Sequence, residues 1–309
     1  MNKGRSIRLT KNKDSYGITF NAMASSCEVI IQSTDKQLAT KLADIIATEV
    51  WRIEDKYSRY NQRSVCSVIN NSAGCSIAID EETYLLLNFA QQCYQLSDGL
   101  FDISSGVLRR TWSFQGDQSS EGNNDNFPTE AQVKQNLTHV GWRKIYFDQK
   151  LIRLAKGMEI DFGGIGKEYA VDRAIILAKQ LTNSPVLVNL GGDLAVTSSR
   201  LNNEPWQVAI EHPDTDNNDL NLADMIISLK TGALATSGDA RRFLIHKGKR
   251  YSHILNAKTG WPIKEAPRSI TVVAPQCIQA GILATLALLQ GIHAEQFLEE
   301  QEIKFWARR

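Results

Sequence analysis

The sequence predicts an α+β fold in which helices pack against mixed, largely antiparallel sheets. Helical spacing and short apolar segments typical of strands follow one another without the regular alternation of a doubly wound parallel sheet. Hydrophobic residues make up 42% of the 309 residues, so a sizeable core is available. No internal repeat or Pro-rich linker divides the chain. We therefore expect a polar N-terminal tail over residues 1–20 and a single domain over residues 21–309.

The spacing of apolar residues predicts the elements in order. Between Leu38 and Ile53, for example, apolar side chains recur every three or four positions, which is typical of a helix with one buried face. We expect helices at 35–56, 80–96, 165–181 and 276–290, strands at 27–32, 185–190, 206–211, 225–229, 251–255 and 270–273, a hairpin formed by 144–147 and 151–154, and a surface loop at 115–127.

Composition excludes several classes of function. A net charge of +1 gives no global electrostatic attraction for nucleic acid. No apolar run approaches the roughly 20 residues of a membrane-spanning helix, and residues 1–17 lack the apolar core of a secretory signal. A cytoplasmic protein is the simplest expectation, with the periplasm as the alternative if a leader was removed. The five cysteines are widely spaced without a C-x-x-C pair, which favours free thiols over disulfides or zinc.

Two glycine-rich segments are candidates for anion binding. Residues 161–166 (DFGGIG) lead into a predicted helix that begins with Lys167. Glycines let backbone N–H groups approach a ligand, and the N-terminus of a helix favours anions. Residues 189–193 (NLGGD) end an apolar strand in the same manner. Taken alone, the first segment could equally be a tight turn, and the second is better explained as a turn with a capping aspartate.

A third polar segment could carry proton transfer. Residues 235–242 (ATSGDARR) contain Asp239 and two arginines, and His253 follows about ten residues later in a predicted strand. Histidine is the side chain best suited to proton transfer near neutral pH. A solitary histidine is more often a packed or surface residue, but one close to an aspartate and two arginines is a candidate general base.

Taken together and in this order, the motifs of the chain resemble those of the FAD:protein FMN transferase (ApbE) family. The similarity covers nearly the whole chain, from about Ala22 to about Gly291. The matching segments are AMASSCEV (22–29), YSRYNQRSV with IN (57–70), SDGLFDIS (97–104), IDFGGIGKEYAVDRA (160–174), LVNLGGDL (187–194), WQVAIEHP (206–213), GALATSGDARRF (232–243), YSHILNAKTGWPI (251–263) and SITVVAPQCIQAGILATLALLQG (269–291).

This resemblance implies an ApbE-like, T-fold-like α+β fold that holds FAD in a cleft. It implies cleavage of the FAD pyrophosphate, transfer of the FMN half to a Thr or Ser of an acceptor protein, and release of AMP. It also implies a magnesium ion on the phosphates. Pyrophosphate cleavage depends mainly on positioning and charge neutralisation, which fits such a site. The implied residues are His253 and Asp239 for catalysis, Met23, Tyr60, the backbone of Leu100, Phe101 and Asp102, Lys167, Arg173 and Ile254 for FAD, and the Ala170 carbonyl and Thr285 for magnesium.

The sequence departs from the family pattern at the metal site. Gly281 stands where the family has a metal-binding aspartate, and Glu168 stands where it usually has glycine. Magnesium prefers oxygen ligands that include at least one carboxylate. A surface position on the helix is the simpler expectation for Glu168, with a replacement carboxylate as the alternative. Asn256 and Ala257 replace the usual Asp-Pro, which is a milder change.

Three functions are therefore open from the sequence. The first is a magnesium-dependent flavin transferase, which His253, Asp239, Lys167 and Thr285 favour. The second is an FAD-binding protein of the same fold without transfer activity, which Gly281 favours. The third is an FAD pyrophosphatase in which water replaces the acceptor hydroxyl. The expected partners are FAD and, for the first function, a protein that carries a Thr or Ser acceptor.

Overall fold

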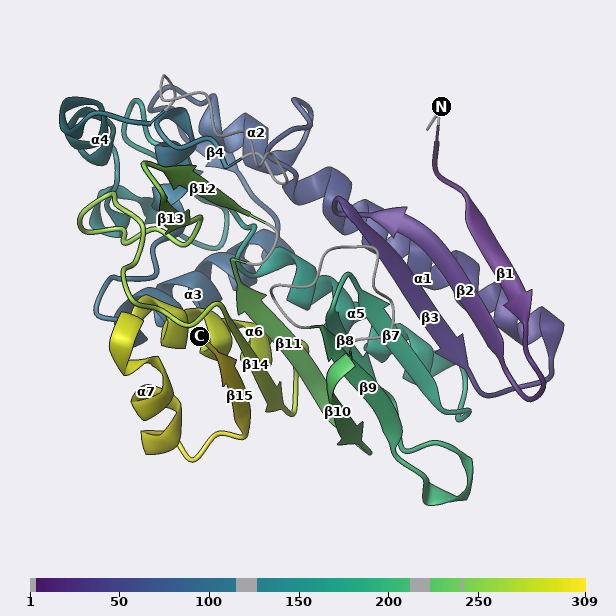
Figure 1. Cartoon of the computed structure of the whole chain (residues 1–309). Helices are drawn as coiled ribbons and strands as arrows, with labels where there is room; N and C mark the ends of the chain where they lie inside the picture. Colours follow the sequence, from purple (N-terminus) through teal and green to yellow (C-terminus); the bar gives the residue numbers. More distant parts are fainter. Residues whose placement is uncertain (1–3, 115–126, 212–222, 240–241) are drawn as a thin grey trace.

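An eight-stranded sheet forms the centre of the molecule (Figure 1). The computed structural model describes residues 4–114, 127–211, 223–239 and 242–309. Each neighbouring pair of strands in this sheet is antiparallel. In their order across the sheet the strands are β1 (Ile7–Lys11), β2 (Tyr16–Ala22), β3 (Ser25–Ile31), β7 (Val186–Leu190), β8 (Asp193–Val196), β11 (Gly232–Gly238), β14 (Ser269–Ala274) and β15 (Phe305–Arg308).

The apolar run of β7 is explained by burial on both faces of the sheet. Val186 and Val188 belong to the larger core cluster, whereas Leu187 between them belongs to a second cluster on the opposite face. Side chains of a strand alternate between the two faces, so a strand that is covered on both sides is apolar throughout. The sheet is therefore the middle of three layers.

Three long helices form the layer on one face of the sheet (Figure 1). They are α1 (Lys36–Tyr57), α5 (Gly166–Leu181) and α6 (Cys277–Leu289). α5 lies between the other two and contacts both, and α6 also packs on β11 and β14. The side chain of Asp35 accepts hydrogen bonds from the first turn of α1 and fixes where that helix begins.

A two-stranded ribbon covers the other face. It consists of β9 (Trp206–Glu211) and β10 (Ala223–Leu229). Trp206 and Val208 from the first strand and Ile227 from the second pack with apolar residues of β7, β8 and β11. This packing buries the second face of the central strands without a helix.

The remaining elements lie mainly beyond the helical layer and at one end of the sheet (Figure 1). A third apolar cluster, which includes Trp112 and Ala257, is formed where several of them meet. They are α2 (Val65–Asn70), α3 (Glu81–Leu96), η1 (Ile103–Arg110), α4 (Glu130–Leu137), η3 (Trp142–Lys144), η4 (Leu201–Asn203), η5 (Gly291–His293), α7 (Ala294–Glu300), the small sheet of β4 (Ile77–Ala78), β6 (Leu151–Arg153) and β5 (Tyr146–Phe147), and the hairpin of β12 (Phe243–His246) and β13 (Lys249–Ser252).

The predicted α+β class is confirmed, and the four predicted helices form within one or two residues of their expected ends. The prediction of a polar tail over residues 1–20 is wrong, because β1 and most of β2 lie within this range and pair with each other as strands of the main sheet. The strand expected at 251–255 ends at Ser252, so His253 lies just outside it. Most of the loop expected at 115–127 lies outside the described residues.

A carboxylate on α5 fixes the start of α6. Asp172 accepts a hydrogen bond from the backbone N–H of Cys277 over 2.8 Å and another from that of Ile278 over 3.0 Å. No side chain from the residue that precedes α6 caps this end of the helix. Asp172 therefore satisfies two N–H groups that would otherwise have no partner, and it joins the two helices.

We expect Asp172→Ala to lower the free energy of unfolding by about 1–2 kcal/mol, the usual cost of losing a helix cap. Urea denaturation of the variant and of the wild type would measure the difference. Lys179→Ala is the matched control, because Lys179 is an exposed residue of the same helix and should change stability by less than about 0.5 kcal/mol. Equal stability of the two variants would contradict a capping role for Asp172.

Candidate functional site

The glycine-rich turn at residues 161–166 leads directly into α5. Gly163 donates a backbone hydrogen bond to Oδ1 of Asp161 over 2.9 Å, and the other carboxylate oxygen of Asp161 pairs with Arg59. Ile165, which precedes the helix, provides no side-chain cap. The backbone N–H of Gly166 donates to the carbonyl of Phe162 over 2.7 Å, and among the described residues the N–H groups of Lys167 and Glu168 are left without a backbone acceptor.

Lys167 forms an ion pair at this helix end. Its Nζ lies 2.6 Å from Oδ2 of Asp193, which is at the start of β8 and has a side chain only 3% exposed. Oδ1 of Asp193 also accepts the backbone N–H of Thr236 on β11 over 3.1 Å. Burial opposes the charge on Lys167, but the neighbouring carboxylates outweigh it and raise the pKa of Lys167. Asp193 thus positions the lysine and connects α5 with two strands.

Met23 lies in a strained turn between β2 and β3. Met23 and Ala24 have φ angles of 52° and 57°, in the left-handed region that residues other than glycine rarely adopt. The backbone N–H of Met23 donates to Oε1 of Glu54 on α1 over 2.6 Å. This hydrogen bond helps to hold the turn in place, and conformations of this kind often occur at functional sites.

The segment at residues 100–102 is held by its own side chains. Oδ1 of Asp102 accepts from Ser104, and Oδ2 accepts the backbone N–H of Trp142 over 2.8 Å. The ring of Phe101 packs under the glycine-rich turn, since a Cβ on Gly164 would lie 3.2 Å from it. The side chain of Asp102 is therefore occupied, and the N–H groups of Leu100 and Phe101 donate to the carbonyl and the hydroxyl of Ser97, so the segment is held in a fixed conformation.

Tyr60 and Arg173 differ in how far their side chains are available to a ligand. Tyr60 is 78% exposed, and Arg59 donates to its hydroxyl over 2.9 Å while lying over its ring. Arg173 is on α5 and pairs with Glu49 of α1 over 3.1 Å. The exposed ring of Tyr60 is available for stacking on a ligand, whereas the charge of Arg173 is already balanced by a carboxylate.

His253 is half-buried just after β13. Its Nδ1 lies 3.0 Å from the carbonyl oxygen of Arg242, and because a carbonyl only accepts, this contact favours a proton on Nδ1. Nε2 then carries the lone pair that a general base needs. Burial lowers the pKa of His253, so the neutral form is present at neutral pH. Ile254 follows directly, and its backbone pairs with Ile263.

Asp239 acts on this region through arginines. Its side chain accepts hydrogen bonds from Arg250 on β13 over 3.1 Å and from Arg268 over 2.9 Å. A second nitrogen of Arg250 donates to the backbone carbonyl of Asp239 over 2.7 Å. Arg250 lies three residues before His253, so Asp239 fixes the hairpin that carries the histidine.

The two expected metal ligands lie on neighbouring helices. Ala170 is fully buried on α5, and Thr285 on α6 has its hydroxyl 2.9 Å from that of Ser237. The expectation that Glu168 lies on the surface is wrong, because the residue is only 7% exposed and its side chain points into the space between α5 and α6. Burial, followed by the charge of Asp193, raises the pKa of Glu168. No group of three or more His, Cys, Asp or Glu side chains suited to a metal occurs among the described residues.

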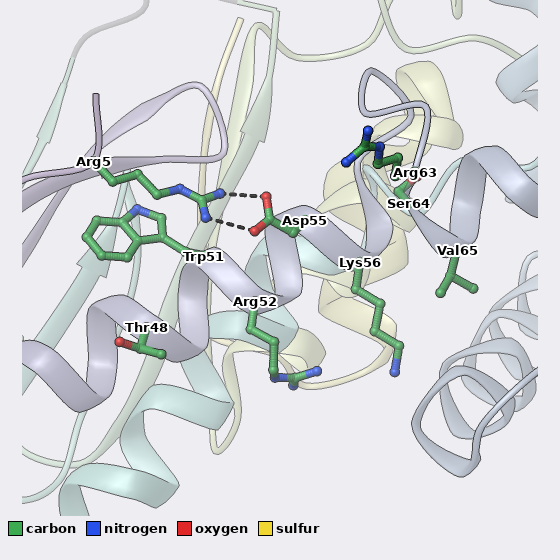
Figure 2. Close-up of a pocket in the computed structure, with 9 residues that line it drawn as sticks. All are labelled: Arg5, Thr48, Trp51, Arg52, Asp55, Lys56, Arg63, Ser64 and Val65. Atoms are coloured by element: carbon green, nitrogen blue, oxygen red, sulfur yellow. Dashed lines mark hydrogen bonds and ion pairs between the residues drawn. The ribbon is translucent and has the colours of Figure 1, made fainter. Parts of the chain in front are cut away.

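A surface hollow of about 570 Å³ lies beside α1 (Figure 2). Arg5, Arg52 and Lys56 contribute to its lining. Arg5 pairs with Asp55, and the other two cations pair with Glu82. Three of the four cations that line the hollow are therefore balanced by carboxylates, and the fourth is Arg63.

The sequence profile of the ApbE family matches residues 23–306. The chain belongs to the ApbE family. An FAD:protein FMN transferase of Haemophilus influenzae is 28% identical over 266 residues, which cover 84% of this chain and 73% of that protein. The transferase of Escherichia coli K12 is 28% identical over 269 residues, covering 84% and 74% of the two chains.

Solved ApbE structures share the fold. The ApbE protein of Thermotoga maritima matches with a TM-score of 0.82 at 29% identity, over 95% of this chain and 94% of that one. The flavin transferase ApbE of Vibrio cholerae matches with a TM-score of 0.78 at 23% identity, over 98% and 94% of the two chains. Within the described residues, no helix has the length and apolar character that a membrane crossing requires.

Sequence reasoning missed the contacts that hold this ApbE site together. Glu54 was not singled out, although it holds the turn at Met23 from 31 residues away. Asp193 was read only as part of a glycine turn, although it is the partner of Lys167. Both are acidic residues on regular elements, and nothing in their local pattern distinguishes them from surface carboxylates.

The Lys167–Asp193 pair gives a test of this geometry. We expect Lys167→Met to lower the free energy of unfolding by about 2–3 kcal/mol. This is less than the roughly 3–5 kcal/mol for breaking a fully buried pair, because the lysine side chain keeps 29% exposure. The loss comes mainly from leaving Asp193 buried without a counter-ion. Lys167→Met/Asp193→Asn should therefore recover part of it in urea denaturation. A double variant as unstable as the sum of the single variants would contradict the coupling.

Proposed function

We propose that this chain transfers the FMN half of FAD to a Thr or Ser of an acceptor protein and releases AMP. The match to the ApbE family over residues 23–306 carries the proposal, because it spans the site as well as the fold. The site supports it with an open helix end beside Lys167 for phosphates and with His253, whose Nε2 is free to accept a proton.

In the proposed reaction His253 acts as the general base. Its Nε2 takes the proton of the acceptor hydroxyl while the hydroxyl oxygen forms a bond to the phosphorus on the FMN side of the pyrophosphate. The bridging P–O bond breaks, and AMP leaves with the electron pair of that bond. A positioned base of this kind typically contributes about 10²–10⁴-fold to the rate. Burial of the imidazole supports the role because it keeps the base neutral.

The phosphates need positive charge in a fixed place. The first turn of α5 provides the N–H groups of Lys167 and Glu168, which have no backbone acceptor among the described residues, and Lys167 provides a cation whose direction is set by Asp193. Charge developing on the leaving phosphate is stabilised by such a pre-organised set, which does not have to reorient during the reaction. The exposed ring of Tyr60 and the turn at Met23 are proposed to contact the flavin and its attached chain.

A magnesium ion belongs to this proposal as a bound partner of FAD. When bound, it would neutralise phosphate charge during cleavage. The Ala170 carbonyl and the Thr285 hydroxyl would hold it, and both are hard oxygen donors of the kind magnesium prefers. The residues present fit such an ion, because Oε2 of the buried Glu168 has no hydrogen-bond partner in the structure and lies beside α6.

A direct assay tests the proposal. The protein is incubated with FAD and Mg²⁺, with and without an acceptor domain that carries a Thr, and AMP and covalent flavin are measured by chromatography and mass. AMP together with an acceptor heavier by FMN is the expected result. AMP that forms equally well without any acceptor would instead indicate a pyrophosphatase. FAD that binds but stays intact would indicate an FAD-binding protein.

We expect His253→Ala to lower the transfer rate by about 10²–10⁴-fold while FAD affinity stays nearly unchanged. Single-turnover transfer and FAD titration by fluorescence would measure the two effects. His293→Ala is the matched control, because His293 is an exposed histidine at the end of η5. Transfer that survives in the His253 variant at the rate of the control would show that His253 is not the base.

A further inference from the structure

Glu168 is an acidic residue with an unsatisfied oxygen inside the protein. Its side chain is buried between α5 and α6, and Oε2 has no hydrogen-bond partner among the residues that the structure describes. A buried carboxylate without a partner is costly, since it loses its hydration and gains nothing in return. Asp193 lies near enough to add a second negative charge. Apart from Lys167, which is committed to Asp193, no cation among the described residues balances Glu168.

Gly281 provides the room for this side chain. A Cβ on Gly281 would lie 2.6 Å from Cγ of Glu168 and 2.8 Å from Oε1. Both distances are shorter than any ordinary contact between these atoms, so a side chain at 281 and Glu168 in its present position exclude each other. The carboxylate of Glu168 therefore fills the space that a residue on α6 would otherwise occupy.

The register between the two helices places this carboxylate beside Thr285. Asp172 contacts α6 at Cys277, and Glu168, one turn earlier on α5, contacts it at Gly281. The two helices therefore run in opposite directions, and the next turn of α6 brings Thr285 toward the beginning of α5. The hydroxyl of Ser237 on β11 lies 2.9 Å from that of Thr285. A buried carboxylate and two hydroxyls are thus brought within about one helical turn of each other near the N-terminal end of α5.

We propose that Glu168 is the carboxylate ligand of a divalent cation at this position and replaces, from α5, a ligand that α6 does not provide. The inference rests on the proposed FAD site for the phosphates that would complete the coordination. Magnesium and manganese are hard cations that favour such oxygen ligands and keep open positions for phosphate and water. A bound cation would give Oε2 the partner that it lacks.

Binding of Mn²⁺, followed by electron paramagnetic resonance in the presence of ADP, tests the proposal without using activity. The wild type should bind Mn²⁺, and Glu168→Gln should weaken it by at least about tenfold, the smallest effect expected for a metal ligand. Glu130→Gln, which removes an exposed carboxylate from α4, should leave the affinity unchanged. Equal affinity of the Glu168 variant and the wild type would overturn the assignment.

A second variant moves the carboxylate to the other helix. Glu168→Ala/Gly281→Asp should bind Mn²⁺ within a few-fold of the wild type, whereas Gly281→Asp alone should be destabilised by the close contact with Glu168. Thermal unfolding should also show that Mn²⁺ with ADP raises the Tm of the wild type and of the double variant but not of Glu168→Gln. A double variant that folds but binds no better than Glu168→Gln would count against a shared ligand position.

The outcome is separate from that of the proposed function. Loss of Mn²⁺ binding in Glu168→Gln would support the ligand even if FAD were never transferred. Conversely, a wild type that transfers FMN but shows no Mn²⁺ binding that depends on Glu168 would overturn the ligand and leave the transferase standing.

Discussion

The contact between α5 and α6 is the constraint on which the site depends. Asp172 holds the first turn of α6, and Glu168 fills the gap at Gly281 one turn further along. Because α6 also packs on β11 and β14, this contact sets the distance between the helical layer and the strands that carry Asp193 and Ser237. The N-terminal end of α5, which we propose to face the phosphates, is therefore positioned by packing behind it as well as by the hydrogen-bonded turn before it.

Charges at the site are held by partners on other elements. Lys167 is directed by Asp193, the turn at Met23 by Glu54, and the hairpin before His253 by Asp239 through Arg250. Each of these contacts fixes a group before any ligand arrives, so the proposed reaction would need little reorganisation when charge develops on a phosphate. The same arrangement explains why the chain tolerates strained backbone at Met23, since the surrounding contacts compensate for it.

The sequence predicted the elements that have a strongly apolar face and the motifs that are rich in glycine or charged residues. It did not predict the position of side chains whose surroundings are formed by residues far away in the chain. The helix at 165–181 and the strand at 185–190 were clear because burial dictates their composition. β1 was missed because an edge strand has one exposed face and a polar sequence. Glu168 was taken for a surface residue because the space that buries it is created by a glycine 113 positions later, which no local pattern shows.

The mutual exclusion at 168 and 281 also limits how such a chain can change over time. A single substitution that adds an acid at 281 meets Glu168 at 2.6 Å, and one that shortens Glu168 removes the carboxylate that fills this space. The arrangement with Glu168 and Gly281 and the arrangement with an acid at 281 are thus separated by a single variant that has either a steric clash or no carboxylate in this space. Related chains should therefore carry one arrangement or the other, and the residues at positions 168 and 281 should co-vary.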